Sequence, residues 1–164
     1  MKYEGILIVG DENYKYKELA YELSKSKDYK LLRVISDDNE CSESFYIETE
    51  NLDKIAPKNF LVKWKFMENI YAIFREEFVE ILNQNKVPII ILPQNLFESF
   101  DNAVLAYKIR FMSLYAYYPK DKLKLDIEEI ENIQKKSHIY KNKCTYSINN
   151  VSINASSKLV KRLW

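Results

Sequence analysis

Residues 5–10 read Gly-Ile-Leu-Ile-Val-Gly, an unbroken apolar run near the start of the chain. A continuous apolar run rich in β-branched residues is typical of a strand that is buried on both faces. Residues 11–13, Asp-Glu-Asn, then offer turn and helix-capping chemistry. Apolar side chains recur at helical spacing from Tyr16 to Leu23. The start of the chain therefore predicts a buried strand, a loop and an amphipathic helix.

The same alternation of strands and helices continues to the end of the chain. Apolar or alternating runs predict further strands at Leu31–Ile35, Phe45–Ile47, Phe60–Phe66, Val87–Leu92, Ile109–Tyr117 and Thr145–Ile148. Helical periodicity or length predicts helices near 51–55, 74–82, 96–107, 127–141 and 159–163. Strands that alternate with helices, with core strands apolar throughout, favour an α/β fold with a mostly parallel sheet flanked by helices. Because no repeat or Pro/Gly-rich linker interrupts residues 1–164, we expect one domain.

The charge balance and the length of the apolar runs exclude several classes of function. Lys and Arg number 25 against 24 Asp and Glu, a formal net charge of +1. Such a chain has no bulk positive field for nucleic acid, so the sequence carries no strong signal for a nucleic-acid partner. Apolar runs such as Ile89–Leu92 are far shorter than the roughly 20 residues that span a bilayer. With no signal-peptide pattern at Met1, we expect a cytoplasmic protein without a membrane partner.

The scarce residue types exclude much of catalytic chemistry. Cys41 and Cys144 are the only cysteines, and His138 is the only histidine. A disulfide scaffold, a metal cluster or a histidine-rich site cannot be built from so few. The sequence has 2 glycines, Gly5 and Gly10, which leaves a glycine-rich phosphate loop unsupported. We therefore predict no metal and no cofactor.

The order of motifs in the middle of the chain resembles guanylate kinase. The motifs are Phe45-Tyr46-Ile47, Phe60-Leu61-Val62, Asn69-Ile70-Tyr71-Ala72, a helix, and the strand Val87–Leu92. Guanylate kinases read Asp-Tyr-His-Phe, Phe-Leu-Glu-Trp, Asn-Tyr-Tyr-Gly, a helix and a buried strand. The resemblance implies a parallel core, a small inserted lobe at about residues 36–70 that held the nucleoside monophosphate, and a lid. The lid region is reduced to the short segment 119–125.

At the phosphate loop the sequence departs from the family. A loop of the form Gly-x-x-x-x-Gly-Lys-Ser/Thr cradles phosphates with its backbone, its lysine and its hydroxyl. Counted from Gly10, Lys15 stands at the second glycine, Tyr16 at the lysine and Lys17 at the hydroxyl position. We therefore interpret Gly10, Lys15, Tyr16 and Lys17 as a vestigial phosphate loop, and predict that ATP does not bind in the family manner.

The positions that hold the nucleoside monophosphate have changed too. The family grips its phosphate with arginines after the second strand, whereas residues 36–44 contain no Arg or Lys. Phe45 stands where a phosphate-binding tyrosine is expected, and Val62 where a glutamate reads guanine. Tyr71 keeps the family identity. The acidic side chains of the 36–44 loop are Asp37, Asp38, Glu40 and Glu43.

The leading hypothesis is a catalytically inactive guanylate kinase-like protein that acts as a protein-interaction or regulatory module. Trp64 lies between Lys63 and Lys65, a pattern that fits a contact face as well as a solvated strand. The predicted contact residues are Phe45, Val62, Trp64, Tyr71, Asp37 and Asp38. Their acidity favours a basic or apolar protein partner.

Two alternatives remain open at this point. One is a nucleotide-binding sensor or divergent nucleotide kinase with an unorthodox phosphate site built from Lys15, Lys17 and Tyr71. The other is a subunit whose missing arginines come from a neighbouring copy. The sequence leaves the oligomeric state undetermined.

Overall fold

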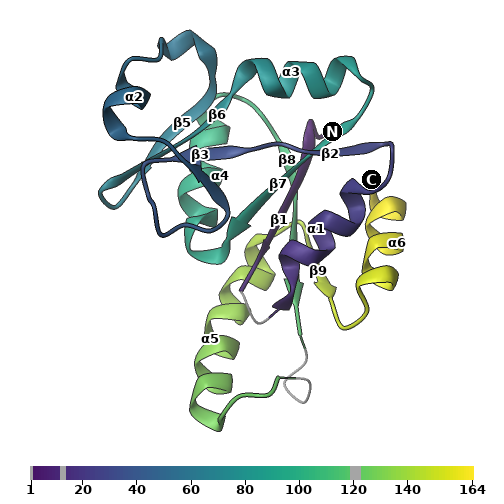
Figure 1. The fold of residues 1–164 in the computed structure, drawn as a ribbon. Coiled ribbons are helices and arrows are strands. Elements are labelled where there is room, and N and C mark those ends of the chain that lie inside the picture. The colour runs from purple at the N-terminus through teal and green to yellow at the C-terminus, as the bar shows by residue number, and fades with distance from the viewer. Residues whose placement is uncertain (1, 12–13, 119–122) are drawn as a thin grey trace.

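The central sheet has five strands, and every pairing within it is parallel. Its order is β2 (Tyr29–Leu31), β7 (Val87–Pro93), β1 (Gly5–Gly10), β8 (Phe111–Tyr117) and β9 (Tyr146–Asn149). The computed structural model in Figure 1 describes residues 2–11, 14–118 and 123–164. The predicted α/β architecture with a mostly parallel sheet is confirmed.

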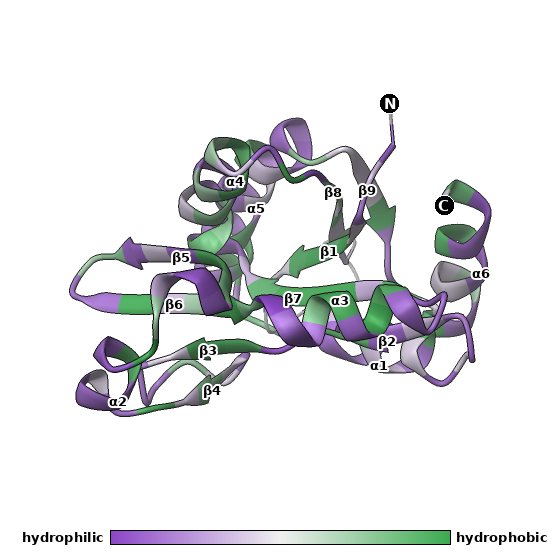
Figure 2. Ribbon diagram, turned by 90° about the horizontal axis from the view of Figure 1, so that it is seen from above, coloured by the Kyte–Doolittle hydropathy of each residue, from purple (hydrophilic) through white to green (hydrophobic). Residues whose placement is uncertain are grey.

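Helices cover both faces of this sheet (Figure 1). On one face lie α1 (Tyr16–Ser24) and α6 (Ile153–Leu163); on the other lie α3 (Arg75–Asn83), α4 (Phe97–Ala106) and α5 (Ile127–Lys143). Strand β1 shows the reason, because its side chains alternate between the faces. Ile6 and Ile8 pack in the cluster that includes α1 and α6, while Leu7 and Val9 pack in the cluster on the other face. The apolar strands at the centre are visible in Figure 2.

A second sheet of four strands forms the small lobe, which we define as residues 34–74. Its order is β4 (Ser44–Tyr46), β3 (Val34–Ser36), β6 (Asn69–Phe74) and β5 (Phe60–Phe66). Strands β5 and β6 are an antiparallel pair, whereas β3 and β4 are parallel. The short helices α2 (Thr49–Asp53) and η2 (Pro57–Asn59) connect β4 to β5, and η3 (Gln94–Leu96) follows β7 in the core.

Two local predictions were wrong. The expected strand Leu31–Ile35 is divided, because β2 ends at Leu31 in the central sheet and β3 begins at Val34 in the lobe. At the division, Leu32 N–H still donates to Ile89 O in the central sheet (2.8 Å), and Arg33 N–H donates to the Glu77 carboxylate (3.3 Å). Strand β6 was not expected, and α3 begins at Arg75 after it.

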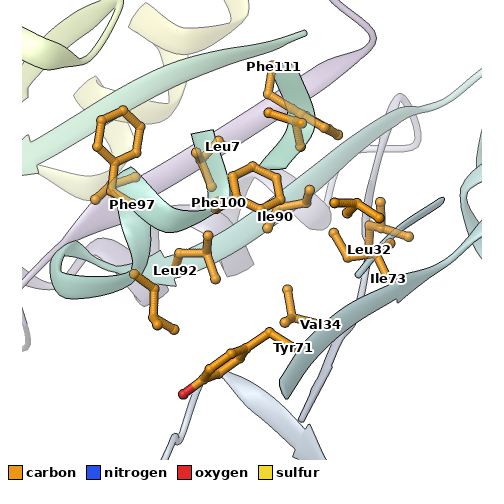
Figure 3. Packing of buried hydrophobic residues seen from close by; sticks show 14 of the residues in the cluster. Leu7, Leu32, Val34, Tyr71, Ile73, Ile90, Leu92, Phe97, Phe100 and Phe111 are labelled. Atoms are coloured by element: carbon orange, nitrogen blue, oxygen red, sulfur yellow. The ribbon is translucent and has the colours of Figure 1, made fainter. Parts of the chain in front are cut away.

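The small lobe packs onto the core through a shared apolar cluster. Tyr71 and Ile73 of β6 belong to the same buried cluster as Leu92, Phe97 and Phe100 of the core, part of which Figure 3 shows. Val62 and Trp64 belong to the same cluster. The lobe is therefore fixed on the core by buried side chains along one side. In the part of the chain that the structure describes, no helix is long and apolar enough to cross a membrane.

Candidate functional site

A cavity of about 370 Å³ lies between the core and the small lobe. Its floor is the carboxyl end of β1 and β7, where Gly10 and Pro93 line it. Ligands of open α/β sheets bind outside the carboxyl ends of the strands, where the strand order reverses. The opposite wall comes from the acidic loop of the lobe and from Tyr71. This position makes the cavity the candidate functional site.

The charged side chains that line the cavity are mostly acidic. Four carboxylates, Asp11, Asp38, Glu40 and Glu43, line it together with one lysine, Lys136 of α5. Carboxylates that face one cavity repel a polyanion and attract a cation. Among the described residues, no group of three or more His, Cys, Asp and Glu is arranged to hold a metal ion.

Tyr16 occupies the space beside the turn where a phosphate loop would begin. A Cβ added at Gly10 would lie 2.8 Å from the Tyr16 Cβ, so the ring of Tyr16 packs directly on this glycine. Tyr16 is buried, and its hydroxyl donates a hydrogen bond to the Glu43 carboxylate. The residue at the family's lysine position therefore reaches across to the acidic loop.

Glu43 also accepts the charge of Lys17. Lys17 Nζ lies 3.1 Å from Glu43 Oε1 and donates to Ser42 Oγ at 2.7 Å. The Glu43 side chain is 6% exposed. Burial alone would raise its pKa, but the hydrogen bonds from Tyr16 and Lys17 outweigh burial and hold the pKa below the ordinary value. We call the contacts among Tyr16, Lys17, Ser42 and Glu43 the Glu43 clamp; they join α1 to the acidic loop.

Lys15, the other candidate phosphate ligand, turns away from the cavity. Its backbone is left-handed (φ 51°), and the side-chain amide of Asn150 donates to the carbonyls of Tyr14 (2.8 Å) and Lys15 (2.9 Å). The Nζ of Lys15 lies 5.6 Å from the centre of the Tyr118 ring. Of the four predicted phosphate-loop residues, Gly10 and Tyr16 line the cavity, whereas Lys15 and Lys17 do not. Residues 12 and 13 of the predicted turn lie outside the described residues.

The two aspartates of the predicted contact surface bind the lobe's own groups. Asp37 accepts hydrogen bonds from Ile70 N–H (2.8 Å) and Thr49 Oγ1 (2.9 Å). Asp38 accepts from the Tyr71 hydroxyl at 2.7 Å. Burial, together with this carboxylate, raises the pKa of Tyr71, which keeps the hydroxyl a neutral donor. The acidic loop is thus tied to β6 by its own carboxylates.

The apolar part of the predicted contact surface is mostly buried. Val62 is 0% exposed, Tyr71 2% and Trp64 7%. Trp64 stacks on Tyr71 with ring centres 5.5 Å apart and donates from Nε1 to Ser99 Oγ at 3.1 Å. These three side chains are mostly enclosed in the core, although Tyr71 also lines the cavity, so their role as partner contacts stays a prediction. Phe45 is 56% exposed and stays available to a partner.

A chain of buried polar side chains reaches the cavity, and no sequence pattern predicted it. Gln94, 7% exposed, lines the cavity, and its Oε1 accepts a hydrogen bond from the Tyr115 hydroxyl at 3.0 Å. Tyr115 also contacts Ser137 Oγ (3.0 Å), which contacts the Tyr14 hydroxyl (2.5 Å). Gln94 thus places a side-chain amide at the cavity, with its oxygen held by Tyr115.

Cys41 adds little chemistry to the site. Cys41 lines the cavity, but burial raises the pKa of its thiol, which disfavours the reactive thiolate. Residues 119–122 of the predicted lid lie outside the described residues. The surroundings of Cys41 therefore do not support it as a nucleophile.

The fold can now be compared with known proteins. No protein-family model and no curated protein matches the sequence. Among solved structures, the chain is similar to the guanylate kinase from Anaplasma phagocytophilum, with a TM-score of 0.62 and 10% sequence identity. The similarity covers 98% of this chain and 84% of that chain. At this identity the likeness concerns the fold alone. The fold expected from the motif order is confirmed: this chain has a guanylate kinase-like fold.

Proposed function

We propose that this protein is a non-catalytic interaction module with a guanylate kinase-like fold. Its cavity takes a cationic group of a protein partner in place of a nucleotide. The proposal keeps the location of the expected contact surface on the acidic loop. The contact surface is now the cavity, which Tyr71 lines, while Val62 and Trp64 are buried behind it and do not line it.

The Glu43 clamp is the observation that carries the proposal. Phosphoryl transfer depends almost entirely on positioning and on cations that stabilise the charge of the phosphates. Here the lysine nearest to the phosphate-loop position, Lys17, is neutralised by the buried Glu43. A phosphate would have to displace a carboxylate that already has a hydroxyl and an ammonium group as donors. The arrangement therefore argues against a donor nucleotide at this place.

The lining of the cavity supports a cationic occupant. Glu40 is exposed at its rim, and Asp11 and Asp38 line it further in, whereas the charge of Glu43 is already matched by Lys17. An ammonium or guanidinium group gains from carboxylates in a concave, partly desolvated site. Gln94 Nε2 adds a donor for a carbonyl oxygen, which every residue of a peptide offers. A basic residue within a peptide segment matches both features.

The first test asks whether nucleotides bind or react. Purified protein is mixed with ATP, GMP and magnesium, and ADP formation and thermal stability are measured. We expect no ADP above background and no shift of the melting temperature. A ligand at a hundred times its Kd should stabilise the fold by about 2.7 kcal/mol, which a melting curve detects readily. Turnover, or a shift that Lys17→Met abolishes, would instead favour the nucleotide sensor or divergent kinase.

The second test measures cation binding directly. The probe is an arginine flanked by glycines in a short fluorescein-labelled peptide, with fluorescence anisotropy at low salt as the readout. Glu40→Lys should weaken binding at least fivefold, because it reverses a charge at the rim of the cavity. Glu48→Lys is the matched control, since Glu48 is an exposed acid of the same lobe that does not line the cavity. Equal effects of the two variants would contradict a specific site.

A further inference from the structure

A second hollow, of about 210 Å³, lies on the other side of the acidic loop. We call it the Phe45 groove. Apolar side chains from α1, the β2–β3 segment, β4 and β7 dominate its walls. They are Tyr21, Leu31, Leu32, Val34, Phe45 and Ile91. Tyr21 is 52% exposed and Phe45 56% exposed, so two aromatic rings that border the groove remain in contact with water.

The groove and the acidic cavity share a wall. Ser42 and Glu43 line both hollows, and the loop segment that carries them separates one from the other. The Glu43 clamp holds this segment against α1 through Lys17 and Tyr16. The two hollows are therefore neighbours with a fixed rim between them, which is a preformed arrangement for a ligand that crosses it.

The charged groups that line the Phe45 groove are already paired. Lys17 and Glu43 pair with each other at 3.1 Å. Arg33 Nε lies 3.0 Å from Glu77 Oε2, and its guanidinium carbon lies 5.6 Å from the centre of the Phe45 ring. A ligand charge has nothing to gain in such a groove, whereas an apolar side chain gains by leaving water. The groove therefore selects an apolar group, and the cavity beside it selects a cationic one.

We propose that the partner segment lies across the 42–45 rim, with a basic side chain in the acidic cavity and an apolar side chain in the Phe45 groove. This inference rests on the proposed function and specifies its partner. The partner carries a basic and an apolar residue close together in an accessible segment. The acidity of the cavity provides the charge complementarity, and the paired charges of the groove provide the selectivity for an apolar anchor.

The probes are fluorescein-labelled peptides in which a varied run of glycines separates one arginine from one phenylalanine. There are two control sets. In the first, serine replaces phenylalanine and arginine is kept; in the second, glutamate replaces arginine and phenylalanine is kept. Affinity is measured by fluorescence anisotropy. We expect at least one spacing of the arginine–phenylalanine peptide to bind tenfold more tightly than its serine version. The glutamate version should not bind, because the cavity repels it.

Variants at exposed rings test where the apolar anchor lies. Phe45→Ser and Tyr21→Ser should remove most of the gain that phenylalanine provides while leaving the arginine–serine peptide unaffected. Tyr46→Ser is the matched control, because Tyr46 is also 56% exposed in β4 but does not line the groove. Circular dichroism melting curves check that the variants fold. We expect them to fold, because substitutions at exposed positions usually change stability little.

The outcomes separate this inference from the function on which it rests. If the arginine peptides bind with equal affinity with and without phenylalanine, and Glu40→Lys weakens both, the groove inference fails and the cationic cavity stands. If Tyr46→Ser and Phe45→Ser reduce affinity equally, the groove is not the anchor site and the inference fails. If no peptide of any set binds, both proposals fail.

Discussion

The five-stranded sheet and the acidic rim of the small lobe are stabilised by different interactions. Ile6 and Ile8 of β1 are 0% exposed and covered by helices, so apolar burial holds the central sheet on both faces. In the lobe, β4 is an edge strand of three residues whose Phe45 and Tyr46 are exposed. The neighbouring loop is held by carboxylates that bind hydroxyls, a backbone amide and a lysine. The core thus depends on area removed from water, and the rim of the site depends on a few polar contacts.

This difference matters because the cavity lies on the boundary. Its floor belongs to the core strands, and its acidic wall belongs to the lobe. Variants that loosen the polar contacts should alter the site with less damage to the fold than variants of the central sheet.

The largest effect is expected at the centre of the core. Ile8→Ala should lower the free energy of unfolding by about 2–5 kcal/mol, because it leaves a cavity between tightly packed side chains. Urea unfolding followed by circular dichroism measures this. Phe45→Ala in exposed β4 is the control and should change stability by about 0.5 kcal/mol or less. Similar losses in the two variants would break the contrast between core and rim.

The next effect is expected at the contact between Tyr71 and Asp38. Tyr71→Phe removes a hydroxyl that donates to a carboxylate at 2.7 Å. Bonds to charged groups contribute about 1.5–3 kcal/mol, so we expect a loss in that range. In hydrogen–deuterium exchange, Tyr71→Phe should speed up deuterium uptake relative to wild type in residues 36–44 but not in β1. Tyr46→Phe, which alters an exposed ring, should change neither quantity. Uniformly faster exchange throughout the chain would contradict a local tether.

A smaller effect, dependent on pH, is expected from the Glu43 clamp. The pKa of Glu43 is lowered in the fold from its ordinary 4.5, so its stabilising contribution is fully present above pH 4.5. That contribution is lost as pH falls through the lowered value. Glu43→Gln should cost on the order of 1 kcal/mol at pH 7 and flatten the acid side of the stability profile. Urea unfolding across pH, with Glu40→Gln as the exposed control, measures this. If the free energy of unfolding of Glu43→Gln fell with decreasing pH as steeply as that of wild type, titration of the clamp would not contribute to the acid sensitivity.

The smallest effect is expected where the chain passes from one sheet to the other. Arg33 and Glu77 form an ion pair there, with an Arg33 side chain that is 54% exposed. Solvent screens such pairs, so Glu77→Gln should cost about 0.2–1 kcal/mol, and less at high salt. A double-mutant cycle with Arg33→Gln isolates the pair. A coupling energy as large as the loss in Tyr71→Phe would contradict the expectation that this exposed ion pair contributes little to stability.

Most elements of the core could be predicted from the sequence, but the division of the 31–35 strand could not. The buried positions Tyr16, Leu19, Ala20 and Leu23 of α1 follow from their helical spacing, and β1 follows from its unbroken apolar run. The parallel sheet follows from the alternation of such elements. The separation of 31–35 into two strands did not follow, because Leu31 and Val34 are both apolar. Only the fold shows that β2 pairs with β7 in one sheet and β3 with β4 and β6 in the other.

The site divides in the same way. The absence of an intact phosphate loop after Gly10 and the acidity of the 36–44 loop can be read directly from the amino-acid order. The contacts of Glu43 with Tyr16 and Lys17, the bond from Tyr71 to Asp38 and the burial of Trp64 arise only in the folded chain. Periodicity reports which face of one element is apolar. It cannot report which face of another element will cover it, because such contacts join residues that only the completed fold brings together.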